Sequence, residues 1–155
     1  MLLVRRNLYS VDWDLRHNRT IQQVAWPADE KASDYWHVTK QGNVRLRLST
    51  EITLQCRSRL VTVYRRGEKI EYVEVSMMNG TFDQVSNDAR NVARRLRVPE
   101  SLLTQWLSEV SAGKRNPLIF HSQEADCDIS LEVVKTLDAI EPLGLEATLF
   151  FERLP

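Results

Sequence analysis

Residues that interrupt regular structure are scarce in this chain, which has only five glycines and five prolines among 155 residues. That scarcity excludes a collagen-like or low-complexity chain. Apolar residues make up 43% and charged residues 27%, the balance of an ordinary globular protein that can bury a core of its own. We therefore expect a single domain over residues 1–155, with a loop-rich N-terminal segment over about residues 1–40.

Cysteine is also scarce, and Cys56 and Cys127 are the only two. Neither belongs to a CxxC pattern, so no spacing predicts zinc binding or redox chemistry. Both fall in stretches with strand-like patterning, where buried free thiols are expected. In an oxidising compartment the two could instead form a disulfide across the sheet.

No apolar run reaches the roughly 18 residues that a membrane span requires, so we expect no span. The apolar stretch at residues 1–4 is followed at once by Arg5 and Arg6, and it is too short for a signal peptide. A cytoplasmic location is the resulting expectation, with a secreted protein trimmed of its leader as the alternative.

The short motifs of several common enzyme classes are missing as well. The chain has no glycine-rich phosphate loop of the GxGxxG or P-loop type, no GxSxG nucleophile turn and no HExxH pair. The sequence therefore predicts no bound cofactor, no catalytic residue and a non-enzymatic function.

What the chain does have is a long alternation of apolar and polar residues over residues 44–60. A repeat of two residues predicts a β-strand with one buried and one exposed face. The even positions include Val44, Leu46, Leu48, Ile52 and Leu54, and four odd positions are arginine: Arg45, Arg47, Arg57 and Arg59. One straight strand over residues 44–65 would be about 70 Å long, so we expect an interruption near residues 49–51 or 57–59.

Further strands are predicted on both sides of this alternation. Before it, strand patterns occur at residues 11–15, 20–26 and 35–39, with a turn at residues 41–43. After it, a hairpin turn at residues 66–68 leads into a strand over residues 69–78. The remaining strands are expected at residues 118–121, 129–133 and 147–151, the last of them after a turn at residues 142–144.

Between these two groups of strands, apolar residues recur at intervals of three and four, which predicts two consecutive helices over about residues 81–97 and 99–112. Thr81 with Gln84 matches a capping box, and Pro99 suits the first position of the second helix. The order strands, helix, helix, strands predicts an α+β fold. We expect a mainly antiparallel sheet of about six to eight strands with both helices on one face.

The net charge is zero, but the charges are unevenly distributed. Residues 1–115 contain 19 Lys and Arg against 13 Asp and Glu, whereas residues 116–155 contain two against eight. The acidic C-terminal strands are expected to neutralise the basic central strands across the sheet. Arginine outnumbers lysine 16 to 5, and its guanidinium suits bidentate contacts with carboxylate or phosphate.

The arginines of this region are the sharpest functional signal. The candidate partner-binding residues are Arg45, Arg47, Arg57, Arg59, Arg65 and Arg66. We expect a non-enzymatic protein-binding module, of adaptor, accessory, inhibitor or immunity type, that uses an arginine-rich sheet face or the edge strands. A nucleic-acid-binding protein that uses the first four of these arginines is the alternative. Against it, Tyr64 and Tyr72 are the only rings near the run, so stacking of bases has little support.

A second alternative is a small enzyme or metal-binding protein with its site near His121 to Asp128. That stretch combines an imidazole, a thiol and three carboxylates within eight residues. Asp12 and Asp14 form another carboxylate pair, with Arg16 beside them on the same face of a strand. Side chains in a strand or loop do not all point one way, so an acidic loop is the expected interpretation and no metal site is predicted.

Overall fold

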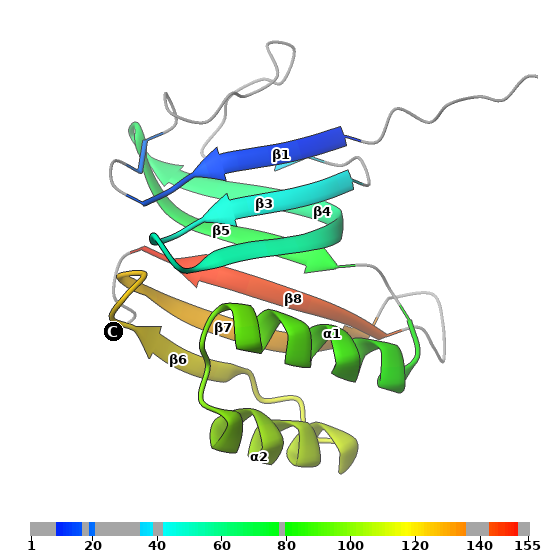
Figure 1. Cartoon of the computed structure of the whole chain (residues 1–155). Coiled ribbons are helices and arrows are strands. Elements are labelled where there is room, and N and C mark those ends of the chain that lie inside the picture. The colour runs from blue at the N-terminus through cyan, green and yellow to red at the C-terminus, as the bar shows by residue number, and fades with distance from the viewer. Residues whose placement is uncertain are drawn as a thin grey trace, which may run out of the picture.

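A computed structural model describes residues 9–16, 19–20, 35–38, 42–77, 80–135 and 143–151 of the chain. Their eight strands form one sheet, and two helices stand between the fifth and the sixth strand. In chain order the elements are β1 (Tyr9–Asp14), β2 (Tyr35–Val38), β3 (Gly42–Arg47), β4 (Thr53–Arg66), β5 (Lys69–Met77), α1 (Phe82–Arg95), α2 (Glu100–Ser111), β6 (Leu118–Ser122), β7 (Cys127–Lys135) and β8 (Leu143–Phe150). The predicted α+β fold and its order of elements are confirmed (Figure 1).

The strand order in the sheet is β1-β3-β4-β5-β8-β7-β6, with β2 paired to β4 outside this path. Neighbouring strands are antiparallel except β1 and β3, which run parallel. The prediction of a mainly antiparallel sheet is therefore confirmed, although the parallel pair was not expected. The chain passes through β2 between β1 and β3. β3 therefore begins beside the start of β1, with Gly42 opposite Tyr9, and the two strands run parallel.

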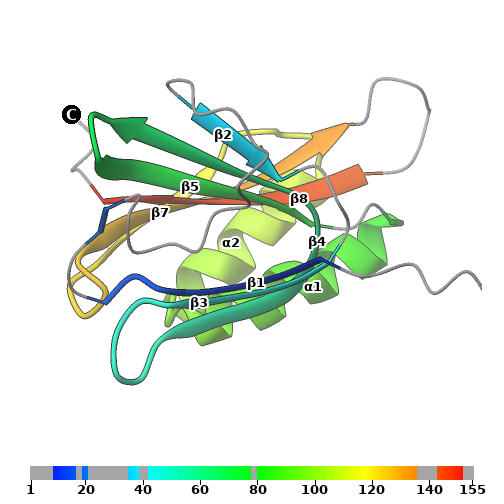
Figure 2. The same cartoon turned by 90° about the horizontal axis from the view of Figure 1, so that it is seen from above.

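β4 is the element at which the sheet changes direction. Its first half pairs with β3, whereas the described pairing with β5 starts at Ser58, and β2 lies along its second half. The register with β5 shifts between Ser58 and Leu60, the sign of a β-bulge, which bends a strand and increases its twist. β1, β3 and the first half of β4 consequently form a layer in front of β5 and β8 (Figures 1 and 2). An interruption was predicted near residues 49–51 or 57–59, and the structure interrupts the strand at both places.

The alternation of residues in β3 and β4 separates a buried face from an exposed one. Leu46 and Leu54 are fully buried opposite each other, while Arg45 and Gln55 beside them are exposed. Beyond the bulge the buried apolar residues of β4 stand at odd positions, Val61 and Val63, because one extra residue moves the side chains that follow it to the other face. Thr62 between them is buried as well. The buried side chains of this front layer join those of β5, β7 and β8 in one core cluster.

Two helices cover part of this core. At the start of α1, Thr81 Oγ1 accepts a hydrogen bond from the backbone N–H of Gln84, and Gln84 Oε1 accepts one from the backbone N–H of Thr81. The predicted capping box is therefore confirmed. α1 contacts β4 and β8, and α2 contacts β6. Pro99 is the N-cap of α2 and not its first residue, since its ψ of 132° is extended.

Two predicted turns are wrong. Gly42 and Asn43 belong to β3, and Leu143 and Gly144 belong to β8. Glycine favours turns through its conformational freedom, but at both places pairing with a neighbouring strand outweighs that preference.

Of the N-terminal segment, the structure describes residues 9–16, 19–20 and 35–38. The strand predicted over residues 35–39 is confirmed as β2. The strand predicted over residues 20–26 lies outside the described residues except for Thr20, which forms an isolated bridge with Lys69. Of the described helices, neither is long and apolar enough to cross a membrane.

Candidate partner-binding groove

The six arginines predicted to bind a partner do not form one surface. Arg45, Arg47 and Arg57 lie on the outer face of the front layer, where the β3–β4 register places them close together. Arg59 lies at the bulge of β4, where the register with β5 shifts. Arg65 and Arg66 lie farther along β4, at the hairpin turn into β5. The structure therefore brings three of the six residues together.

Two aspartates of β1 share this outer face. The parallel register places Asp12 beside Arg45 and Asp14 beside Arg47. Arg47 forms an ion pair with Asp12 at 3.1 Å, and Arg16 forms one with Asp14 at 2.6 Å. The hydrogen bonds from Arg16 lower the pKa of Asp14 to about 2, so this carboxylate is held ionised by a guanidinium and not poised as an acid. Within the described residues, the carboxylates that pair with this face come from β1 and not from the C-terminal strands.

Arg45 and Arg57 have neither an ion pair nor a hydrogen bond within the described part of the chain, and both are exposed. They line a hollow of about 420 Å³ together with Gln55, Asp12 and a third guanidinium, that of Arg95. Arg95 comes from the last turn of α1 and also lacks a partner among the described residues. Three positive charges from three elements, none of them paired within the described residues, thus surround one hollow.

A second hollow of about 480 Å³ adjoins the first and lies between β4 and α1. The two hollows share Gln55, Cys56, Arg57 and Arg95 among their lining residues. The second adds Met77 of β5 and three residues from the side of α1 that carries Arg95, because the helical spacing of three and four brings these side chains together: Asp88, Asn91 and Val92. We call the two hollows together the arginine groove.

No described ionic or hydrogen-bonding partner satisfies the three guanidinium groups of the groove, so their charge is available to an anion from outside. Comparisons with protein-family models, curated proteins and solved structures give no match. The functional interpretation of the chain therefore rests on the chemistry of its own residues.

Arg95 was not among the predicted binding residues. The sequence shows that it lies in a helix rich in arginine, but helical spacing alone does not reveal which strand the helix lies beside. One feature of the sequence could have suggested Arg95. Asp88, Asn91 and Arg95 form a polar stripe along the helix, although this stripe borders the buried side of α1 at Val92.

Cys56 lies in the groove, but its thiol is not suited to nucleophilic chemistry. Burial raises the pKa of Cys56 to about 11, so the thiol stays protonated near neutral pH. Burial likewise raises the pKa of Cys127 to about 11. Both cysteines are free, as expected, although Cys56 is only partly buried.

The stretch from His121 to Asp128 comprises the end of β6, a turn over residues 123–126 and the start of β7. His121 Nδ1 lies 2.6 Å from Asp128 Oδ1, because the two residues are opposite each other in the β6–β7 register. Glu124 instead pairs with Arg97 at 2.8 Å, and the Cys127 side chain is buried. Across the described ranges no three potential ligands gather at a metal-binding distance.

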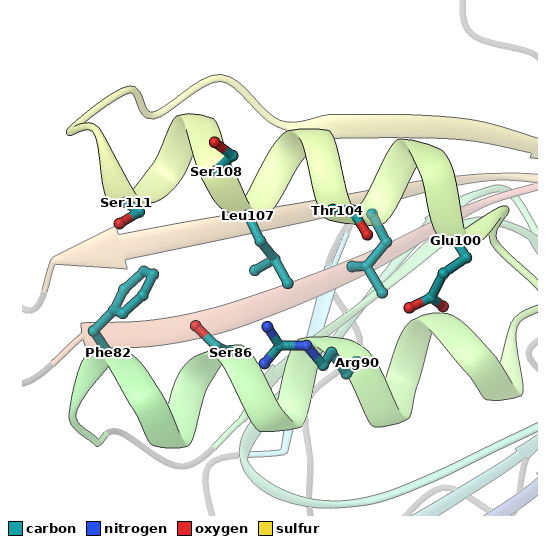
Figure 3. A pocket seen from close by; sticks show the side chains of 9 residues that line it. Phe82, Ser86, Arg90, Glu100, Thr104, Leu107, Ser108 and Ser111 are labelled. Atoms are coloured by element: carbon teal, nitrogen blue, oxygen red, sulfur yellow. The ribbon is translucent and has the colours of Figure 1, made fainter.

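A third hollow, of about 270 Å³, lies between α1 and α2 (Figure 3). Arg90 of α1 and Glu100 of α2 both line it, so it has no preference for one sign of charge. Ser86, also on α1, is buried with its hydroxyl oxygen lacking a hydrogen-bond partner in the described structure. This hollow is smaller and chemically less selective than the arginine groove.

Replacing Ser86 with alanine is expected to raise the free energy of unfolding by about 1 kcal/mol. The change removes a buried hydroxyl without a partner and improves the helix propensity of α1. Urea unfolding measures the effect. Ser108→Ala on α2 is the control, because Ser108 is exposed and its replacement gains the propensity alone. A gain no larger than that of the control would contradict the cost assigned to the buried hydroxyl.

Proposed function

We propose that the chain is a non-enzymatic protein-binding module whose arginine groove binds an acidic segment of another protein. The observation that carries the proposal is the convergence of Arg45, Arg57 and Arg95 around one groove without partners among the described residues. Guanidinium groups bind carboxylates through paired, charge-assisted hydrogen bonds. The groove would serve the chain in the same way as an adaptor, as an accessory protein or as an inhibitor of the partner, including immunity against a toxin.

The composition of the groove favours a protein ligand over a nucleic acid. Tyr64 and Tyr72 stack on each other with ring centroids 4.2 Å apart, and neither ring lines the groove. The groove therefore offers no tyrosine of this pair on which a base could stack. Asp12 and Asp88 also line it, and they would repel a continuous phosphate backbone more than carboxylates spaced along a peptide.

The test is a binding measurement with the double variant Arg57→Glu/Arg95→Glu. The probe is a short fluorescent peptide of alternating glutamate and valine, with an oligothymidine as the competing class of ligand. We expect the wild-type chain to bind the peptide with an affinity that falls as salt rises, and the double variant to bind it at least about tenfold more weakly.

The matched control is Arg90→Glu/Arg94→Glu, which makes the same change of charge on α1 at residues that do not line the groove. This control should retain most of the peptide affinity. Equal losses in the two double variants would show attraction by overall charge and contradict the proposal. Groove-dependent binding of oligothymidine in preference to the peptide would favour the nucleic-acid alternative.

A further inference from the structure

Among the described residues, one edge of β4 has no strand paired to it inside the arginine groove. Over Thr53 to Arg57, β4 pairs with β3 on one side, while its described pairing with β5 on the other side begins at Ser58, opposite Met77. On that side α1 borders this edge across the hollow of about 480 Å³. An unpaired edge of a sheet is a template on which another chain can add a strand.

The hydrogen bonds of the β3–β4 hairpin show which backbone groups point into the groove. Leu48 N–H donates to the carbonyl of Ile52 at 2.9 Å, which places these two residues at a hydrogen-bonded position of the ladder, although Ile52 N–H itself donates to Ser49 Oγ. In an antiparallel ladder, hydrogen-bonded pairs alternate with pairs that are not hydrogen-bonded. The backbone N–H and C=O of Leu54 therefore point toward β3, whereas those of Thr53 and Gln55 point away from it.

The other side of the hairpin agrees with this assignment. Arg47 lies opposite Thr53 in the register, and its carbonyl accepts a hydrogen bond from Leu15 N–H at 2.8 Å, on the side of β1. The backbone groups of Arg47 and Thr53 therefore both point away from the ladder that joins their strands. Neither Thr53 nor Gln55 has a backbone hydrogen bond toward α1 within the described residues.

We infer that the acidic segment binds in an extended conformation, as an added strand on the open edge of β4 between β4 and α1. The inference rests on the proposed function and specifies the binding mode and the partner's pattern. Alternate side chains of a strand point to opposite faces. Carboxylates on one face would meet Arg57 and Arg95, while small apolar side chains on the other would meet Cys56 and Val92. The partner segment is therefore expected to alternate acidic and apolar residues.

The decisive probe is the same glutamate–valine peptide made in two N-methylated forms. One form carries the methyl groups on the glutamate nitrogens and the other on the valine nitrogens. In an extended peptide the N–H groups of alternate residues point to the same edge, so each form blocks one edge of the peptide. Strand addition uses one edge only. We expect one form to bind at least about tenfold more weakly than the unmethylated peptide and the other to bind nearly as well.

The matching protein variant is Gln55→Pro, with Gln55→Ala as its control. Proline removes the Gln55 N–H that points into the groove, and the ladder with β3 does not use that group. We expect Gln55→Pro to bind the peptide about tenfold more weakly than Gln55→Ala, which loses the same side chain but keeps the backbone N–H. Thermal unfolding of both variants checks that the fold is intact, and the two methylated peptides decide the question if Gln55→Pro does not fold.

The outcomes separate this inference from the proposed function. If both methylated peptides bind like the parent while Arg57→Glu/Arg95→Glu still abolishes binding, strand addition is wrong and the acidic-partner proposal stands. If the unmethylated peptide does not bind the wild-type chain at millimolar concentration, both proposals are overturned. Selective loss with one methylated form supports both.

Discussion

Replacing Leu54 with alanine is expected to lower the free energy of unfolding by about 2–5 kcal/mol. Leu54 has no exposed surface and lies opposite Leu46, which in turn lies beside Trp13 of β1. The smaller side chain would leave a cavity beneath the front layer, and close-packed interiors fill such cavities only in part. Urea unfolding followed by tryptophan fluorescence measures the loss.

The control for this prediction is Gln55→Ala, one residue farther along the same strand. Gln55 is exposed on the outer face, so its replacement should change stability by less than about 0.5 kcal/mol. Comparable losses at the two neighbouring positions would contradict the division of β4 into a buried and an exposed face. The arginine groove depends on that division, because it places Arg45 and Arg57 in solvent.

Much of the local structure could be predicted from the sequence. The alternation over residues 44–60 was sufficient to assign the faces of β3 and the first half of β4, because the need to bury apolar side chains sets the two-residue period. The helices were also readable, since Thr81 and Gln84 marked the start of α1 and the apolar stripes indicated the buried sides, with Leu102 of α2 as an exposed exception. These signals depend on residues close together in the chain.

The composition of the groove could not be predicted in the same way. Arg65 and Arg66 follow Arg57 closely in sequence, but β4 runs on past the bulge and carries them to its far end. Arg95 is distant in sequence, yet the packing of α1 beside β4 brings it to Arg57. The parallel pairing of β1 with β3, which gives Arg47 its carboxylate, is likewise a long-range choice with no local signature.

Arg19 provides the second large effect expected on stability. Its guanidinium donates hydrogen bonds to the carbonyls of Leu15 at 3.0 Å, Ala125 at 2.6 Å and Asp126 at 2.8 Å. It also lies 4.3 Å above the ring of Phe151. One side chain therefore joins the residue after β1, the turn between β6 and β7 and the residue after β8.

Arg19→Ala is expected to lower the free energy of unfolding by about 3 kcal/mol. Each hydrogen bond from a charged donor stabilises by about 1.5–3 kcal/mol, but the three share one half-buried group and are not additive. The contact with Phe151 adds about 0.5–1 kcal/mol. Urea unfolding measures the loss, and amide exchange should show it first in the residue 123–126 turn, where two of the carbonyls lie.

Two further variants distinguish the geometry of this contact from its charge. Arg19→Lys keeps the charge, but an ammonium at the end of a flexible chain cannot reach three separated carbonyls and should recover only part of the stability. Arg16→Ala removes an arginine whose ion pair with Asp14 is exposed, and the loss should be much smaller. If Arg19→Lys were as stable as the wild-type chain, a point charge over Phe151 would suffice. The sheet alone would then hold the three segments together.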